Sequence, residues 1–316
     1  MIAHDSTNRV PESILPSSLA DRFFELVVRY RLALLLALPV LALVSLLVVP
    51  LAILFQYSLY TNVPGKGIIF VLTLDNYVHF FTDSYYLTGA FVTLSSAVVV
   101  TLITLVVSYP VAYFYARSRF RFKGLLLIML LAPFYLNIIV RIYGWMIILG
   151  RTGILNNLLV GYGILTKPYD FLESYLGLII ILVYVQSPIM VLSLTGPLQA
   201  ISESLLEAAG VCGARDLKVF KDVILPLSIP GILSGSVLVF AATVAAFIVP
   251  LIVGGKIGFL FLSVMVYEQM NTIQNWAFGS AIAVILLAAS VTLVTVYSSL
   301  VRRSRIGVVM SEKFIR

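Results

Sequence analysis

The chain has 316 residues, of which 61% are hydrophobic and only 11% are charged, and its formal net charge is +7. A soluble domain usually carries about 25% charged residues. The deficit is too large for a surface that faces water, so lipid must cover much of the molecule. The one cysteine, Cys212, excludes an intrachain disulfide framework.

Residues 1–31 form a polar N-terminal segment that we expect to lie in the cytoplasm. A secretory signal has a short basic start, an apolar core of about 7–15 residues and a small-residue cleavage site. Here about thirty mixed polar residues come first, and the apolar run after Arg31 is much longer than such a core. This first run is therefore predicted to remain as a membrane span.

Long gaps between charged residues predict six membrane-spanning helices. A span needs about 20 apolar residues, and a charge at the bilayer centre costs at least ~2.5 kcal/mol. The predicted spans cover residues 32–57, 86–116, 124–150, 175–198, 227–252 and 272–301. The expected fold is an all-α integral membrane domain over residues 32–303, followed by a cytoplasmic tail, 304–316.

The distribution of basic residues predicts the orientation. With both termini inside, sixteen of the 21 Lys and Arg residues fall in inner segments, four fall in outer segments, and Arg141 lies within a span. Inner loops of membrane proteins carry such an excess. We therefore expect an integral membrane protein with both termini in the cytoplasm. The positive charge is explained by topology, so the expected partner is the lipid membrane and not a nucleic acid.

The one long inner loop, residues 199–226, is predicted to form two short helices across the inner membrane face. Residues 204–207 have the Ser-x-x-Glu spacing of a capping box. Gly213 interrupts the first helix, and Asp216 is predicted to cap the second. Pro226 is predicted to end the second helix where the fifth span begins.

This loop also carries a set of residues at a characteristic spacing, namely Glu207, Ala208, Ala209, Gly213, Leu225 and Pro226. The set resembles the EAA loop of ABC importer permeases, in which isoleucine is preferred where this chain has Val223. The resemblance implies that these residues form a cytoplasmic coupling helix seated in a cleft of a separate ATP-hydrolysing subunit. The alternative is an ordinary amphipathic helix at the membrane surface.

Three further stretches, residues 141–145, 247–255 and 275–283, resemble signature stretches of spermidine/putrescine-type permeases, most closely the first of that importer's two permease subunits. The resemblance implies a MetI-like permease core for most of the chain. It also implies a second homologous permease, two ATPase subunits and an extracytoplasmic binding protein. Related importers carry opines, amino-acid derivatives or other organic ions, so the cargo stays open at this point.

Seven residues are candidates for the cargo pathway: Arg141, Tyr143, Trp145, Phe247, Pro250, Glu268 and Trp276. Tyr143 and Trp145 suit a cation–π wall for an ammonium cargo, or an aromatic belt at the membrane interface. Arg141 is either a cavity residue or an anchor near the outer boundary. Glu268 supplies the anion that a polyamine requires, or is a solvated loop charge.

Several kinds of site are missing from the sequence. No Gly-x-x-x-x-Gly-Lys-Ser/Thr motif is present, so ATP and Mg²⁺ are expected on a partner chain and no cofactor on this one. His4, His79 and Cys212 form no metal-ligand pattern, and no catalytic set lies in the spans. We therefore predict a transport subunit and not an enzyme. An ion-coupled carrier would display more ionisable residues in its spans, and a membrane scaffold would need no EAA-like loop.

Overall fold

The computed structural model describes residues 19–63, 67–118 and 123–312. The chain divides into two units, residues 1–53 and residues 54–316, and each is considered by itself. Among these residues, six helical segments are long and apolar enough to cross a membrane, which is the predicted number: Leu35–Ser58, Ser84–Arg117, Ile138–Gly161, Tyr175–Ala200, Asp216–Val244 and Trp276–Tyr297.

Helix α1, Leu19–Ser58, contributes most of the first unit and continues into the second. It begins within the N-terminal segment that was expected to precede the first span, and it contains Pro39 and Pro50. Each proline removes one backbone hydrogen bond, which a helix in lipid tolerates. Residues 1–18 of the predicted N-terminal segment lie outside the described residues.

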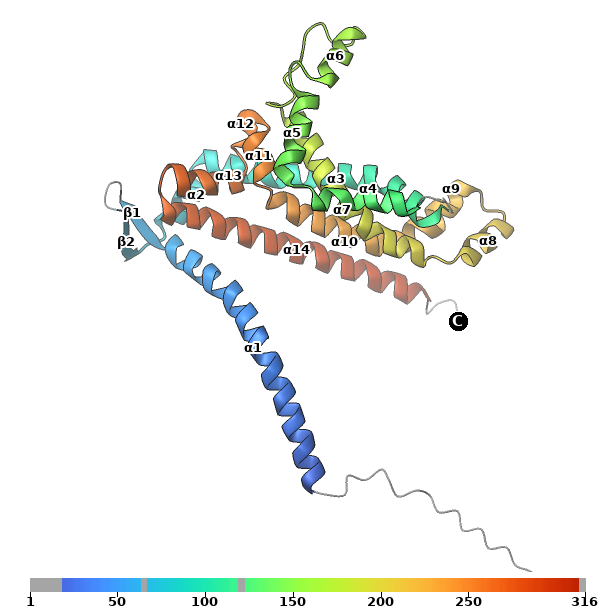
Figure 1. Ribbon diagram of the computed structural model, residues 1–316, viewed down its shortest axis with the longest axis horizontal. Helices are drawn as coiled ribbons and strands as arrows, with labels where there is room; N and C mark the ends of the chain where they lie inside the picture. Colours follow the sequence, from blue (N-terminus) through green and yellow to red (C-terminus); the bar gives the residue numbers. More distant parts are fainter. Residues whose placement is uncertain (1–18, 64–66, 119–122, 313–316) are drawn as a thin grey trace, which may run out of the picture. The chain divides into compact units, whose positions relative to one another are not determined.

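The second unit is a helical bundle centred on α3 (Ser84–Arg117), α7 (Tyr175–Ala200) and α10 (Leu225–Val244), with α14 (Trp276–Glu312) alongside (Figure 1). Its core side chains are completely buried, among them Val100, Leu178, Ile181, Leu182, Leu194 and Val239. Lipid is as apolar as these side chains, so close packing and not the hydrophobic effect joins the helices. Gly231 shows this packing, because a Cβ there would lie 2.9 Å from the carbonyl oxygen of Ser193.

Two buried hydroxyl groups in the bundle are satisfied within their own helices. Thr101 and Thr243 donate to the carbonyl oxygens of Ala97 and Val239, at 2.7 Å in both cases. Such bonds remove the cost of placing a hydroxyl among apolar groups.

The third predicted span, residues 124–150, is not one continuous helix. It divides into α4, Lys123–Tyr135, and α5, Ile138–Leu149, and α5 runs at a steep angle to α4 (Figure 1). Asn137 causes the new start, because its side chain accepts a hydrogen bond of 2.8 Å from the Ile139 N–H and so caps α5. Helix α6, Ile154–Gly161, follows at the far end of α5.

The fifth and sixth predicted spans also differ from the structure in their bounds. Helix α10 ends at Val244, eight residues before the predicted end, and three short helices follow: α11 (Ile248–Ile252), α12 (Gly255–Gly258) and α13 (Leu262–Tyr267). A π-helical turn, η2 (Glu268–Thr272), then leads to α14, which continues to Glu312 through most of the predicted tail.

A small β-hairpin departs from the all-α expectation. Strands β1 (Tyr60–Val63) and β2 (Gly67–Leu72) pair antiparallel before α2 (Asp75–Thr82). Asn76 of α2 holds the first strand, because its Nδ2 donates to the carbonyl oxygens of Ser58 and Tyr60 at 2.9 and 2.8 Å. The fold is otherwise mostly helical, as predicted.

Candidate functional site

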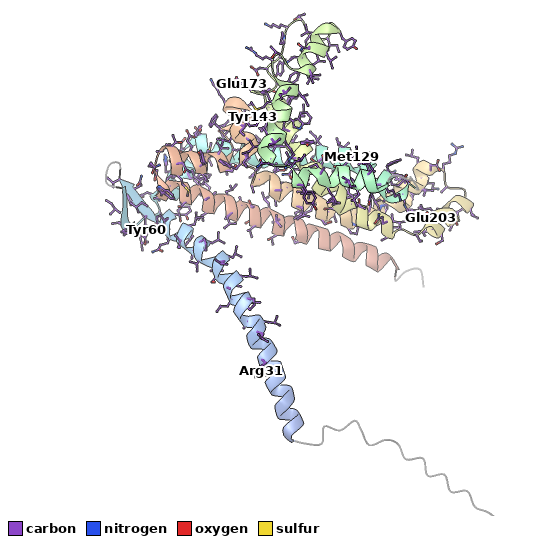
Figure 2. All side chains as sticks on the ribbon, in the orientation of Figure 1. Arg31, Tyr60, Met129, Tyr143, Glu173 and Glu203 are labelled. Carbon is purple, nitrogen blue, oxygen red and sulfur yellow. The ribbon has the colours of Figure 1, made fainter. Side chains whose placement is uncertain are left out.

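The segment between α7 and α10 forms an elbow, residues 201–224, at one end of the bundle. Figure 2 shows Glu203 at this end and Tyr60 at the opposite end. The first part of the elbow is α8, Glu203–Val211, on which Glu207 and Ala208 are exposed and Ala209 is half-buried. Two of the predicted coupling residues thus lie on an accessible surface.

Gly213 turns the chain after α8. Its φ of +79° lies in the left-handed region, which a residue with a Cβ adopts only at a cost. Its N–H donates to the carbonyl oxygen of Gly210 at 2.9 Å, and the Ala214 N–H donates to that of Ala209 at 3.1 Å. These two bonds make a Schellman cap, so the predicted break at Gly213 has a defined geometry.

The predicted capping box is not formed. Helix α8 begins at Glu203, before Ser204, and its N-cap residue Ser202 makes no capping side-chain hydrogen bond. The Ser204 hydroxyl instead donates to the Ser202 hydroxyl at 3.3 Å. The reason is the short link from α7, since the chain leaves α7 at Ala200 and Ile201 is already buried against the bundle.

The second short helix was wrongly predicted to be separate from the fifth span. Helix α9, Asp216–Val219, has Arg215 and not Asp216 at its N-cap, and it runs through a π-helical turn, η1 (Phe220–Ile224), directly into α10. Pro226 therefore does not end a helix. A proline clashes with the carbonyl four residues earlier in an α-helix. The π-turn makes room, because the Leu225 N–H donates to the carbonyl of Phe220.

The elbow packs against the bundle on one side and is bare on the other. The Phe220 ring lies 5.7 Å from the Tyr109 ring and 6.5 Å from the Tyr113 ring, both on α3, measured between centroids. In contrast, Val211 is 89% exposed and Leu217 is 80% exposed. Large apolar side chains that gather on a bare surface are typical of a contact with another protein.

The candidate pathway residues on α5 do not share one environment. Trp145 packs inward, with its ring centroid 5.3 Å from that of Tyr184 on α7. Tyr143 is 57% exposed. The Nε atom of Arg141 is buried and has no hydrogen-bond partner among the described residues. An unpaired guanidinium nitrogen of this kind is costly, so we expect a group outside the chain to satisfy it.

Phe247 and Glu268 lie in different short segments. The Phe247 ring lies 5.1 Å from the ring of Tyr267, the last residue of α13, and Glu268 follows Tyr267 and opens η2.

Pro250 and Trp276, the remaining two pathway candidates, differ from each other in exposure. Pro250 is buried within α11, so its role is in packing. Trp276 is 46% exposed at the start of α14 and makes no ring contact in the described part of the chain.

Several aromatic residues near η2 and at the elbow were not identified from the sequence. Tyr86 accepts a hydrogen bond of 3.1 Å from Gln269 Nε2, and its ring centroid lies 4.8 Å from that of Phe278. Neither Phe220 nor Tyr109 is among the coupling residues that were predicted from the sequence. No local signal identifies them, because their partners lie about a hundred residues or more away along the chain.

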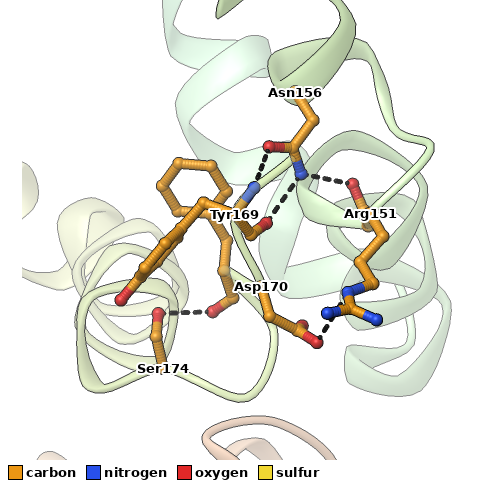
Figure 3. A network of polar contacts seen from close by, with 7 residues as sticks. Arg151, Asn156, Tyr169, Asp170 and Ser174 are labelled. Carbon is orange, nitrogen blue, oxygen red and sulfur yellow. Dashed lines mark hydrogen bonds and ion pairs between the residues drawn. The ribbon is translucent and has the colours of Figure 1, made fainter. Parts of the chain in front are cut away.

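A polar network fixes the loop between α6 and α7 (Figure 3). Asn156 is completely buried, and its Nδ2 donates to the carbonyl oxygens of Gly150 and Tyr169 at 2.9 and 2.8 Å. Its Oδ1 accepts from the Tyr169 N–H at 2.8 Å, and Arg151 pairs with Asp170 at 3.2 Å. The loop is therefore a rigid feature.

A groove of about 370 Å³ lies between α3, α10 and α14. Its lining residues are Val98, Thr101, Leu102, Ser236, Val237, Phe240, Leu293, Val294, Val296 and Tyr297. None of them is charged, so the groove offers no carboxylate to an organic cation.

Residues 105–306 match a protein family described as the binding-protein-dependent transport system inner membrane component. The chain belongs to this family. The matched residues contain the whole elbow and every pathway candidate from Arg141 to Trp276, and the predicted resemblance to ABC importer permeases is confirmed.

Named relatives of this permease agree with the family assignment. It is 33% identical over 255 residues to the spermidine/putrescine transport system permease protein PotB of Haemophilus influenzae, covering 81% of this chain and 88% of that protein. It is 34% identical to PotB of Escherichia coli, covering 76% and 86%. The inner membrane ABC transporter permease protein YdcU of Escherichia coli is 32% identical, covering 67% and 69%.

Solved structures show the same fold. A chain of a bacterial ABC transporter that imports the acidic polysaccharide alginate superposes with a TM-score of 0.74 at 15% identity, covering 89% of this permease and 99% of that chain. A second structure of a bacterial alginate transporter, in complex with a pentasaccharide-bound periplasmic protein, gives a TM-score of 0.71. The predicted MetI-like importer fold is thereby confirmed.

Proposed function

We propose that this permease forms half of the translocation pathway of an ATP-driven importer whose cargo is a polyamine such as spermidine or putrescine. The observation that carries the proposal is the identity of 33–34% to spermidine/putrescine permeases over 76–81% of the chain. The fold does not determine the cargo, because the same fold occurs in a transporter that imports an acidic polysaccharide. The proposed cargo therefore rests on the sequence identity.

The elbow is the proposed coupling site. Glu207 offers a charge to a basic residue of the ATPase, and the small side chains of Ala208 and Ala209 allow close approach of the two backbones. Gly213 fixes the turn that follows them through its left-handed φ. ATP and Mg²⁺ are held by the partner, and this chain supplies only the mechanical connection.

Movement of the elbow has a direct route into the membrane. Residues 216–244 are helical without interruption, through η1, Leu225 and Pro226. A continuous helix transmits displacement and rotation along its axis, whereas a flexible loop would absorb them. The uninterrupted run therefore supports the proposal that closure of the ATPases moves α10.

The proposed cargo contacts combine aromatic rings with a carboxylate. Phe247 and Tyr267 are paired, and Glu268 is next in the chain. Rings attract ammonium groups through their quadrupole, and a carboxylate adds a charge–charge term. Arg141, Tyr143, Trp145 and Trp276 remain pathway candidates, and the positive charge of Arg141 suits a contact with the neighbouring permease better than one with a cationic cargo.

Function requires an assembly. The proposed partners are a second homologous permease, two ATPase subunits and an extracytoplasmic binding protein. The elbow would face the cytoplasm together with both termini, as the excess of basic residues in these segments indicates. The opposite end, with the hairpin and α2, would then face the binding protein.

The cargo is tested with the complete importer in proteoliposomes that contain this permease, its second permease, the ATPases and the binding protein. Labelled spermidine and putrescine should be taken up only with ATP, and excess opine or amino-acid derivative should not compete. Uptake of one of those competitors in place of polyamine would overturn the cargo. Uptake driven by an ion gradient without ATP would overturn the importer class.

Coupling is tested in the same system with Glu207→Ala. Loss of one partner from a charge pair that becomes buried costs more than 1.4 kcal/mol, which corresponds to a factor of ten. We expect stimulated ATP hydrolysis and uptake to fall together by at least about tenfold. If both stay at the wild-type level, the elbow is not the coupling site.

A further inference from the structure

The elbow is joined to the bundle in two ways. The first is covalent, since the elbow follows directly on α7 and η1 continues into α10. The second is lateral, since the Phe220 ring meets the rings of Tyr109 and Tyr113 of α3 edge to face, with interplanar angles of 85° and 84°. Edge-to-face contact at 5–7 Å is a favoured geometry of aromatic pairs.

The π-turn explains why Phe220 points at α3. A π-turn contains one residue more than an α-turn, so it rotates the side chains before it relative to those after it. Pro226 favours this turn by displacing the carbonyl of Asp222. The proline of the coupling loop thus determines which neighbour the elbow touches.

A hydrogen bond reinforces the same contact. The hydroxyls of Tyr109 and Ser228 are 2.9 Å apart, and the Ser228 hydroxyl also donates to the carbonyl oxygen of Leu225 at 2.9 Å. Since a serine hydroxyl has one proton, Tyr109 is the donor to Ser228. The bond joins α3 to the first turn of α10, directly above η1.

The contact lies at a natural bending point of α3. Pro110 falls between Tyr109 and Tyr113, and it removes one hydrogen bond from the helix. Helices bend readily at such positions. The last turns of α3, from Pro110 to Arg117, therefore respond to a lateral force more easily than the rest of the helix.

We propose that Phe220, Tyr109 and Tyr113 form an aromatic link that passes movement of the elbow to α3 as well as to α10. Phe220 is a positioning residue in this link, and it touches neither cargo nor nucleotide. The inference rests on the proposed coupling function of the elbow. It adds α3, to which the elbow is not covalently joined, to the helices that each ATPase stroke moves.

The test is the number of cargo molecules imported per ATP hydrolysed by the complete importer with Phe220→Ala. Basal ATP hydrolysis should stay within about twofold of the wild type, while cargo per ATP falls at least about fivefold, the lower end of typical coupling between sites. Phe220→Tyr keeps the ring and should restore the ratio to within about twofold. A wild-type ratio in Phe220→Ala would overturn the link.

Glu207→Ala separates this inference from the proposed function. If Glu207→Ala abolishes stimulated hydrolysis and Phe220→Ala leaves the ratio unchanged, only the link is wrong. If Glu207→Ala has no effect, the coupling function itself is wrong. The variant Tyr109→Phe removes the bond to Ser228 and keeps the ring, so it should change the ratio by less than about threefold, well short of Phe220→Ala.

A crosslink decides the matter if Phe220→Ala fails to assemble. Cysteines replace Tyr113 and Phe220 in a background with Cys212→Ser, which removes the one native thiol. A short bifunctional thiol reagent with a reducible bond then joins the two positions. Because the cysteines replace two rings of the link, the variant should show a low ratio of cargo to ATP before crosslinking, and the crosslink should raise the ratio again by joining the elbow to α3. A ratio that is the same before and after crosslinking, and the same as in the single-cysteine controls, would overturn the link.

Discussion

Asn156 and Tyr169 are joined by two hydrogen bonds, one from the Asn156 Nδ2 to the Tyr169 carbonyl oxygen and one from the Tyr169 N–H to the Asn156 Oδ1, both 2.8 Å long. The amide group of Asn156 thereby pairs with both backbone polar groups of Tyr169, as a neighbouring strand would in a β-sheet. Because Asn156 is completely buried, water cannot replace these bonds.

Asn156→Ala should loosen the loop between α6 and α7. The substitution leaves the Tyr169 N–H unpaired, at a cost of about 1–3 kcal/mol. We expect hydrogen exchange of the Tyr169 amide to accelerate by roughly 10–100-fold, measured by mass spectrometry on the permease in nanodiscs. Asn157→Ala is the matched control, since Asn157 is exposed and makes one bond of 3.2 Å to Thr152. Equal exchange in both variants would show that the buried bonds do not hold the loop.

Gly213→Ala should destabilise the elbow through its backbone alone. A Cβ at Gly213 has nothing within 4 Å, but the φ of +79° is unfavourable for alanine by about 1–2 kcal/mol. We expect a lower unfolding temperature of the complex and reduced stimulated ATP hydrolysis. Gly213→Asn should lose less, because asparagine tolerates this region.

Gly210→Ala serves as the control for Gly213. Gly210 also has open space around its Cβ position, but it lies within α8, where alanine is favoured over glycine. We expect no loss of thermal stability. A loss in Gly210→Ala as large as in Gly213→Ala would mean that side-chain bulk and not φ limits the elbow.

Gly231→Ala should separate α10 from α7. The added methyl group would lie 2.9 Å from the Ser193 carbonyl oxygen and 3.2 Å from the Leu194 Cα, and these are backbone atoms that cannot rotate away. Overpacking of this kind typically costs about 1–3 kcal/mol. Gly196→Ala, where a Cβ meets nothing within 4 Å, is the matched control on α7 and should be neutral. The measurement is thermal unfolding of the purified complex in detergent.

Glu268→Gln should weaken transport of cationic cargo. Removing the negative charge that the proposed pathway offers lowers affinity for an ammonium group by about tenfold, so the KM for spermidine uptake should rise by about that factor with basal ATP hydrolysis unchanged. Glu173→Gln removes a carboxylate from an exposed loop position and should leave the KM as it was. An unchanged KM in Glu268→Gln would remove this carboxylate from the pathway.

Features governed by local rules were predicted from the sequence. The number of spans follows from the absence of charges over a bilayer's thickness, and the described residues contain six helical segments long enough to cross, although the third differs in its bounds from the predicted span. The turn at Gly213 and the small exposed patch around Ala208 follow from the loop's own residues. The expected cytoplasmic position of the loop rests on basic residues alone, and it stays a prediction.

Features that depend on distant partners were decided only by the tertiary structure. The helix after Asp216 continues through Pro226, although a proline usually limits a helix, because a π-turn removes the clash. The aromatic contacts of Phe220 are visible only in the structure, because α3 brings Tyr109 and Tyr113 against it. Packing between segments a hundred residues apart leaves no pattern in the sequence. The thickness of a membrane does leave one, because it sets the length of each apolar run, and the preference for Lys and Arg on the inner side sets which loops are basic.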